Sequence, residues 1–310
     1  KPTSGSSART ISALSPGSGR CARILSELAR LLSVLRSRSS WSRGARFDSA
    51  GVGVFFTDEG AGPPVVLVHG FAVSGDLNFR VPGLIRALRP NHRVITVDQR
   101  GHGQSDKPPD AGAYGACMVQ DLIRLLDHLG IDRAHVLGYS LGGFVALKLA
   151  CVAQERLLGV GVLGAGYESA EGAGPSILEA IPKLADELEA GRGIGPLSVH
   201  LGGSRERPSF AHRTWVQLVT RFLNDPRALI GVIRGVPELA VSDADLATLR
   251  IPVCSIVGER DPLLNGARAL AKAVPHAQAT VIHGADHVRV PGHPEFRRAL
   301  LGFLAAEGRD

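Results

Sequence analysis

The sequence has few cysteines and no arrangement that would use them. Its four cysteines, among 310 residues, are scattered, with no C-x-x-C pair and no cysteine–histidine pairing at zinc spacing. This argues against a disulfide framework or a cysteine-ligated metal site, and predicts reduced, mostly buried thiols. No apolar run approaches the roughly 20 residues of a membrane-spanning helix, so no transmembrane segment is expected.

An excess of charge is also missing from most of the chain. The formal net charge is +6, but the first 46 residues hold nine basic side chains and one acid. That segment therefore carries +8 and the remainder −2. A nearly neutral body gives no reason to expect nucleic acid as a partner.

The basic segment 1–46 is predicted to lie outside the folded body. Residues 1–20 are rich in Ser, Gly and Pro, which predicts disorder, whereas residues 21–36 place leucines on one helical face with arginines opposite. This pattern is typical of an organelle transit peptide or of a helix in weak contact with a membrane surface. The alternative is an extension that packs weakly on a cytoplasmic protein. A secretory signal is disfavoured, because Ser and Arg interrupt every candidate apolar core.

Strand-like and helical segments alternate through the body. A hairpin is predicted over 47–59, and six buried strands follow over 65–68, 92–98, 136–139, 157–163, 251–257 and 279–282. Helical periodicity lies between or after them, over 81–88, 116–129, 144–150, 265–273 and 294–305. The alternation predicts an α/β fold, a mostly parallel eight-stranded sheet with helices on both faces.

The strand pattern lapses between residues 166 and 249. Helical candidates over 176–190, 210–223 and 226–234 replace it. We therefore expect a helical cap, 166–249, inserted between the two parts of the core, 47–165 and 250–310.

The segment Val136–Gly143 (VLGYSLGG) has the form of a strand, a serine between glycines and a helix start. A G-x-S-x-G sequence at such a junction is typical of the nucleophile elbow, where the serine hydroxyl projects from a sharp turn. Ser140 is therefore the candidate nucleophile.

A serine hydroxyl needs a base to take its proton, and histidine is suited to this near neutral pH. Among eleven histidines, His287 lies in the loop after the last predicted strand, where the order Ser, Asp, His would place the base. His283 falls at the end of that strand, His293 precedes a helix start, and His69 is expected to make structural hydrogen bonds.

The base needs an acid to orient its ring, and Asp261 is the best candidate because it follows the penultimate strand. Asp286 is adjacent to His287, so its side chain would struggle to reach the correct ring nitrogen. Glu168 is the runner-up, and Glu259 is a weaker local rival.

An oxyanion hole needs two backbone N–H groups. Leu141, next after the serine, and Phe71, just past His69-Gly70 on another strand-end loop, are predicted to supply them. Phe71 and Tyr139 are also expected to contact substrate.

No cofactor or metal is expected. Gly164-Ala165-Gly166 follows a strand but lacks the third glycine and the distant acid of a dinucleotide loop. The His283-x-x-x-His287 spacing suits metal ligands on a helix, whereas this stretch is predicted to be strand and then loop.

The chain resembles the α/β-hydrolases over about residues 50–305. The matching segments are VVLVHGF (65–71), VDQRGHGQSDKP (97–108), the elbow, IPVCSIVGERDP (251–262) and GADHVRVP (284–291). The resemblance implies triad roles for Ser140, Asp261 and His287, a structural role for Ser105, and a small-molecule ester as substrate.

Several activities share this triad. Ser140 disfavours haloalkane dehalogenases and epoxide hydrolases, which carry aspartate at the elbow, and His69-Gly70-Phe71 differs from the HGGG sequence of some lipases. A carboxylic ester hydrolase is the main hypothesis. The alternatives are a C–C hydrolase, lactonase, perhydrolase or thioesterase, a lyase, and a non-catalytic receptor on the same fold.

Overall fold

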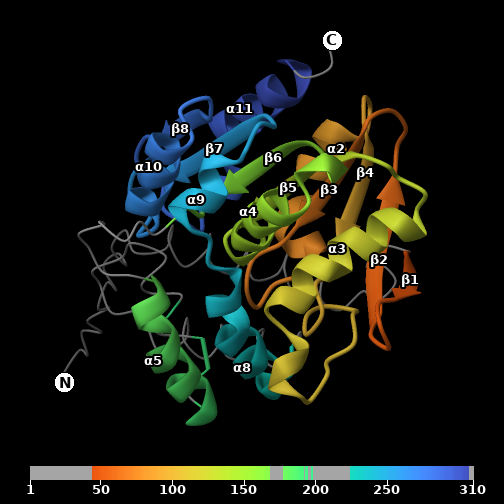
Figure 1. Cartoon of the computed structure of the whole chain (residues 1–310), viewed down its shortest axis with the longest axis vertical. Helices are drawn as coiled ribbons and strands as arrows, with labels where there is room; N and C mark the ends of the chain where they lie inside the picture. Colours follow the sequence, from red (N-terminus) through yellow and green to blue (C-terminus); the bar gives the residue numbers. More distant parts are fainter. Residues whose placement is uncertain (1–43, 168–176, 192, 195–196, 198–223, 307–310) are drawn as a thin grey trace, which may run out of the picture. The chain divides into compact units, whose positions relative to one another are not determined.

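Eight strands form one sheet in the order β1-β2-β4-β3-β5-β6-β7-β8 (Figure 1). The computed structural model describes residues 44–167, 177–191, 193–194, 197 and 224–306. The strands are β1 (Ala45–Asp48), β2 (Gly53–Glu59), β3 (Pro64–Val68), β4 (Arg93–Val97), β5 (Ala134–Tyr139), β6 (Leu157–Leu163), β7 (Val253–Gly258) and β8 (Gln278–Ile282). The β1–β2 and β2–β4 pairs are antiparallel and the other five are parallel. This confirms the predicted α/β fold and hairpin.

Helices cover both faces of the sheet because its inner strands are apolar on both sides. In β3, Val66 and Val68 pack into one hydrophobic cluster with α3 (Ala116–His128) and α4 (Leu141–Val152). Val65 and Leu67 pack into a second cluster with α2 (Leu84–Leu88) and α11 (Pro294–Ala306). The continuous apolar runs of the sequence thus correspond to strands buried on both faces.

The helix predicted over 81–88 is wrong at its start. Helix α2 begins only at Leu84, because Gly83 has a φ of 86° and interrupts the helical path. The preceding helical turn is a separate π-helical segment, η2 (Asp76–Arg80), which the apolar periodicity did not indicate.

The described part of the segment between β6 and β7 is helical. It contains α5 (Ile177–Glu189), α8 (Pro226–Gly235), η5 (Val236–Leu239) and α9 (Asp243–Ala247). The candidate helix 210–223 and the candidate acid Glu168 lie outside the described residues. A cap over 166–249 therefore stays a prediction, and we call 166–249 the inserted segment. The C-terminal part of the core continues with α10 (Leu264–Ala273).

Gly142 on α4 is a position where any side chain would collide with the core. A Cβ atom there would lie 2.1 Å from the Val68 carbonyl oxygen and 2.7 Å from that of His69. Since both neighbours are backbone atoms, they cannot move aside cheaply. We expect Gly142→Ala to lower the free energy of unfolding by about 3 kcal/mol or more.

Urea unfolding of Gly142→Ala beside Gly302→Ala would measure this effect. A Cβ on Gly302, within α11, meets no atom within 4 Å. Alanine should therefore stabilise that helix by about 0.5 to 1 kcal/mol. Equal stabilities of the two variants would contradict the packing described for Gly142.

His135 on β5 is a buried imidazole held neutral. Its side chain packs against Phe303 with ring centroids 6.1 Å apart, and its Nδ1 has no hydrogen-bond partner among the described residues. Burial lowers the pKa of His135 to about 4. Below its unfolded pKa of about 6.5, the unfolded chain binds this proton and the folded chain does not.

Stability should therefore be lost as the pH falls from about 6.5 towards about 4. In His135→Leu this loss should be smaller by on the order of 3 kcal/mol, since this titration is removed. Chemical unfolding over a pH series would measure it. A variant with the same acid-induced loss as the unchanged protein would rule out this contribution.

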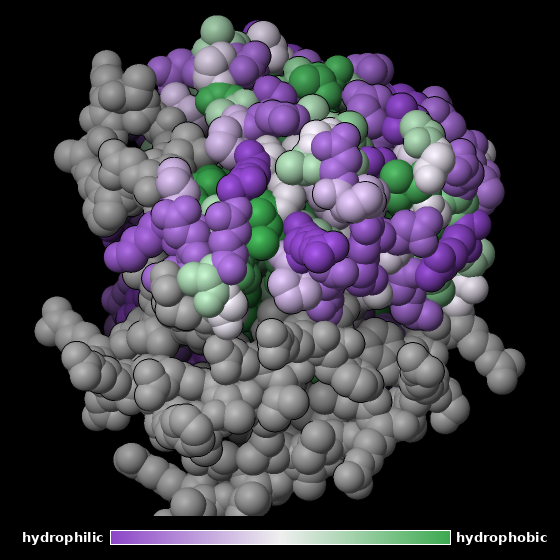
Figure 2. Space-filling view, turned by 90° about the horizontal axis from the view of Figure 1, so that it is seen from below, coloured by the Kyte–Doolittle hydropathy of each residue, from purple (hydrophilic) through white to green (hydrophobic). Residues whose placement is uncertain are grey.

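The surface of the described residues is mostly polar. Figure 2 shows hydrophilic side chains over most of the described part of one face, with hydrophobic ones in small groups. Val81, Val152, Val281 and Val288 are the exposed large hydrophobic side chains that the structure describes. Among the described helices, none is long and apolar enough to cross a membrane. Of the three described cysteines, Cys254 is buried and Cys117 and Cys151 are half-buried.

Candidate active site

Three predicted site residues lie at one edge of the sheet, where parallel strands end. Ser140 follows β5, Asp261 comes shortly after β7, and His287 lies in the loop after β8. The carboxyl ends of neighbouring parallel strands meet at the same edge, which is where ligands bind in open α/β sheets. The topology thus brings Ser140 to two residues that are more than 100 positions away in the chain.

The turn at Ser140 is strained as the elbow pattern predicts. Ser140 has φ 54° and ψ −117°, in a region that L-residues rarely adopt. Its N–H donates to the Leu163 carbonyl at 2.8 Å, and a Cβ on Gly138 would lie 1.9 Å from the Gly142 carbonyl oxygen. Glycine is therefore required beside the serine, and the turn presents the hydroxyl beyond the strand end.

Asp261, His287 and Ser140 form a continuous line of hydrogen bonds. Nδ1 of His287 lies 2.7 Å from Oδ2 of Asp261, and Nε2 lies 3.0 Å from Oγ of Ser140. The Asp261 side chain is fully buried and that of His287 is 6% exposed. Because the carboxylate can only accept, Nδ1 carries the proton and Nε2 is free to accept one from Ser140.

The rival residues have other partners. Oδ1 of Asp286 accepts the N–H groups of Val288 and Arg289, so this side chain caps a turn and does not orient the ring. Glu259 pairs with His283 at 2.9 Å, and the His283 side chain is 91% exposed. The geometry favours Asp261 and His287 over these alternatives.

The loop His69–Ala72 lies directly beside the elbow. A Cβ on Gly70 would lie 3.3 Å from the Cβ of Ser140. His69 is structural, as predicted: Nδ1 donates to the Gly70 carbonyl at 2.7 Å, and Nε2 accepts the N–H of Gln99 at 3.0 Å. Burial lowers the pKa of His69, so the ring stays neutral in this arrangement.

The two predicted oxyanion donors, the N–H groups of Leu141 and Phe71, have no acceptor among the described residues. Their role in binding an oxyanion stays a prediction. Leu141 is the first residue of α4, so its N–H has no acceptor within the helix. The Phe71 N–H has no acceptor among the described residues. The N-terminus of α4 also favours negative charge near Ser140.

Tyr139 lies behind His287. The residue is 4% exposed, its ring centroid is 5.2 Å from that of His287, and its hydroxyl donates to the His287 carbonyl. Burial is the main cause that raises the pKa of this phenol well above its usual value. The negative charges of Asp261 and Asp286 raise this pKa further. The side chain therefore holds the histidine loop, and contact with substrate stays a prediction.

Ser105 braces the loop after β4, as the resemblance implied. Its Oγ accepts the N–H of Phe55 at 2.8 Å and donates to the Asp98 carbonyl. The buried Asp98 carboxylate accepts N–H groups of Gly75 and Gln104 at 2.9 and 2.8 Å. These contacts fix the segment that carries Gln99 against the His69–Ala72 loop.

Three side-chain amides beside the site were missed in the sequence. Asn78, Gln99 and Asn224 each bond to the backbone of the His69–Ala72 loop. Asparagine and glutamine are common in loops, and nothing in their local sequence indicates a distant backbone partner. Only the Asn-Asp-Pro helix start at 224–226 marks one of them as near an ordered element.

Comparison with known proteins agrees with this geometry. The model of the alpha/beta hydrolase fold family matches residues 63–294, which is more than half of the chain. The chain belongs to the α/β-hydrolase family.

Relatives of this α/β-hydrolase differ in what they are named for. This chain is 30% identical over 254 residues to the dihydrolipoyllysine-residue acetyltransferase component of the acetoin cleaving system of Pseudomonas putida. The match covers 78% of this chain but only 64% of that protein. This chain is 29% identical over 274 residues to a 2-hydroxymuconate semialdehyde hydrolase of Pseudomonas putida, covering 84% and 94%. Among solved structures, a thermophilic esterase from Thermogutta terrifontis matches with a TM-score of 0.68 and 25% identity, covering 86% and 99%. The similarities support a hydrolase without distinguishing the bond that it cleaves.

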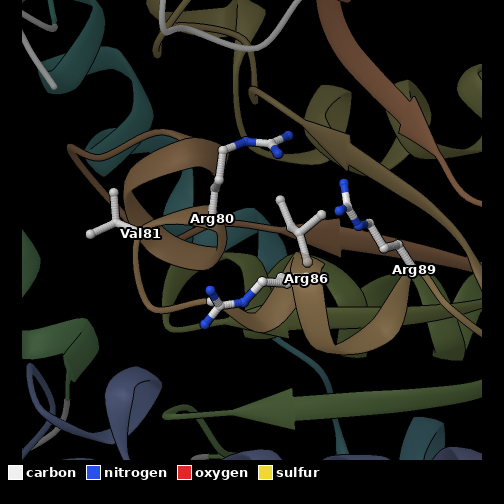
Figure 3. Close-up of a pocket in the computed structure, with 6 residues that line it drawn as sticks. Arg80, Val81, Arg86 and Arg89 are labelled. Carbon is white, nitrogen blue, oxygen red and sulfur yellow. The ribbon is translucent and has the colours of Figure 1, made fainter.

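A separate groove of about 280 Å³ on this α/β-hydrolase contains none of these residues. It is lined by Arg80, Val81, Gly83, Ile85, Arg86 and Arg89. Figure 3 shows the guanidinium groups of Arg80 and Arg86 pointing in different directions, and Arg80 is paired with Glu59 and Asp76. The described lining residues therefore do not form a convergent set of unpaired cations.

Proposed function

We propose that this α/β-hydrolase cleaves a small-molecule carboxylic ester through an acyl-enzyme on Ser140. The observation that supports the proposal is the hydrogen-bonded line from Asp261 through His287 to Ser140. It joins a nucleophile, a base and an orienting acid, all that acyl transfer to a serine requires apart from oxyanion donors.

In the first step, Oγ of Ser140 attacks the ester carbonyl while Nε2 of His287 takes the hydroxyl proton. The Asp261 carboxylate stabilises the imidazolium, and the N–H groups of Phe71 and Leu141 bind the oxygen that becomes negative. The C–O bond of the ester then breaks, and His287 gives its proton to the leaving alkoxide. The products are an alcohol and an acyl group bound to Ser140.

In the second step, His287 takes a proton from water, which attacks the acyl-enzyme. The carbonyl is restored, the bond to Oγ breaks, and Ser140 recovers its proton from His287. The acid leaves, and the chain returns to its starting state without a cofactor.

A C–C hydrolase is the second candidate, because the chain is similar over most of its length to a 2-hydroxymuconate semialdehyde hydrolase.

Rapid mixing with p-nitrophenyl acetate tests the first candidate, the ester hydrolase. We expect a burst of p-nitrophenolate about equal to the enzyme concentration if deacylation is the slower step, and turnover beyond it. Absence of turnover across acetyl to octanoyl esters would sink the ester proposal, and faster turnover of 2-hydroxymuconate semialdehyde would favour the second candidate.

A further inference from the structure

Three side-chain amides hold the backbone of the His69–Ala72 loop. Nε2 of Gln99 donates to the His69 carbonyl at 2.6 Å, Oδ1 of Asn78 accepts the Gly70 N–H at 2.8 Å, and Nδ2 of Asn224 donates to the Ala72 carbonyl at 3.0 Å. These bonds lie on both sides of Phe71 and occupy its neighbours' polar groups. The Phe71 N–H keeps no acceptor among the described residues.

Asn224 comes from a different part of the chain than Gln99 and Asn78. Gln99 follows β4 and Asn78 lies in η2, both within the core, whereas Asn224 belongs to the inserted segment, 152 positions from Ala72. It directly precedes Asp225, whose side chain caps α8 by accepting the Arg227 N–H at 2.7 Å. Helix α8 packs against α5 and against η3 (Ala111–Ala113), and the bond from Asn224 to Ala72 places the start of α8 beside the loop.

The orientation of the Asn224 amide follows from its partner. A carbonyl oxygen only accepts hydrogen bonds, so the amide nitrogen must face Ala72 and Oδ1 must face away. Asn224 is 5% exposed, and its Oδ1 has no partner among the described residues. A buried acceptor without a donor costs free energy that an apolar side chain would avoid. Among the described residues, the bond to the Ala72 carbonyl is therefore the contact that asparagine supplies at this position.

The residue that Asn224 contacts is strained. Ala72 has a φ of 58° and is 3% exposed. Alanine persists in the left-handed region only where its surroundings hold it there. The bond from Asn224 is made at this residue, one position beyond the Phe71 N–H.

We propose that Asn224 is a positioning residue, which holds the Phe71 N–H in place for the oxyanion from the inserted segment. The inference rests on the proposed function, since it assigns a use to the Phe71 N–H. The position of Asn224 at the start of α8 is thereby coupled to stabilisation of the transition state. The coupling acts on the rates of acylation and deacylation, which both pass through an oxyanion, and not on the binding of the ester.

The first test is Asn224→Leu, which has a similar volume and cannot donate. We expect kcat on p-nitrophenyl acetate to fall by about 10-fold or more with KM changed less than about 3-fold, because loss of a single oxyanion donor typically costs about 100-fold or more in kcat. Labelling of Ser140 by a fluorophosphonate should slow by a similar factor, since its P=O oxygen occupies the same position. A folded variant with kcat and labelling rate within about 2-fold of the unchanged protein would overturn the proposal.

Asn224→Asp should make kcat depend on pH in a way that a purely structural role of Asn224 would not. An ionised carboxylate cannot donate to the Ala72 carbonyl, but a protonated one can, and burial raises the pKa of a carboxyl group. The ratio of variant kcat to unchanged kcat should therefore rise as the pH falls from about 8 to about 5. If Asn224→Leu does not fold, this ratio decides, and a ratio that stays flat with pH overturns the proposal.

Lys148→Met is the matched control. Nζ of Lys148 donates to the Ala240 carbonyl at 2.9 Å, so this variant also removes a side-chain bond between the core and the inserted segment, away from the loop. Its kcat and labelling rate should stay unchanged. Ser140→Ala distinguishes failure of the proposed function from failure of the positioning role. If Ser140→Ala retains esterase activity, the proposed function is wrong. If Ser140→Ala loses activity and Asn224→Leu keeps it, only the positioning role is wrong.

Discussion

Replacing Ser140 with alanine should lower kcat on a short p-nitrophenyl ester by about 10⁴- to 10⁶-fold. The hydroxyl is the only group that the change removes, and His287 then has no side-chain nucleophile to deprotonate. Alanine retains the Cβ of serine, so the strain at φ 54° is the same and the fold should be kept. Steady-state kinetics with a circular dichroism melt would measure both effects.

Ser242→Ala is a suitable comparison for this change. Ser242 caps α9 through the N–H of Asp245 and takes no part in the candidate site. Its replacement should cost about 1 kcal/mol of stability and leave kcat unchanged. Retention of most activity in Ser140→Ala would mean that another residue attacks the ester.

Asp261→Asn should lower kcat by about 10⁴-fold with little change in KM. Oδ1 of Asp261 accepts the Leu263 N–H at 2.9 Å, and Oδ2 faces Nδ1 of His287. In the variant the amide oxygen must stay with Leu263, so the amide N–H group faces His287. The imidazole proton then moves to Nε2, which can no longer take the proton of Ser140.

Asp286→Asn tests the same change at the adjacent acid. Its Oδ1 accepts two backbone N–H groups, which the amide oxygen of asparagine would also accept. We expect kcat within about 10-fold of the unchanged protein, since the imidazole tautomer is not affected. If both variants lost activity equally, the assignment of Asp261 as the orienting acid would be contradicted.

Much of the fold could be predicted because the strands are buried on both faces. Runs such as Val65–Val68 leave little choice other than an inner strand between two helical layers, and the structure places them so. The predicted start of α2 was wrong because Gly83 has a left-handed backbone conformation, which a continuous helix from residue 81 cannot contain. The apolar spacing alone gives no sign of this interruption.

The triad candidates could be found from the sequence because each follows a strand in a fixed order. The supports of the site could not. Asn224 meets Ala72 across 152 residues of chain, and its position depends on how α8 packs and not on any local pattern. The place of the Tyr139 side chain behind His287 likewise depends on tertiary contacts.

The residue that carries the acyl group during turnover distinguishes attack by Ser140 from attack by any other side chain. The protein would be mixed with excess p-nitrophenyl acetate, quenched in acid within the burst, and digested for peptide mass analysis. We expect one acetyl group on the peptide that contains Ser140, and none in Ser140→Ala. An acetyl group on another residue, or ester turnover with no adduct on Ser140 at any quench time, would contradict it.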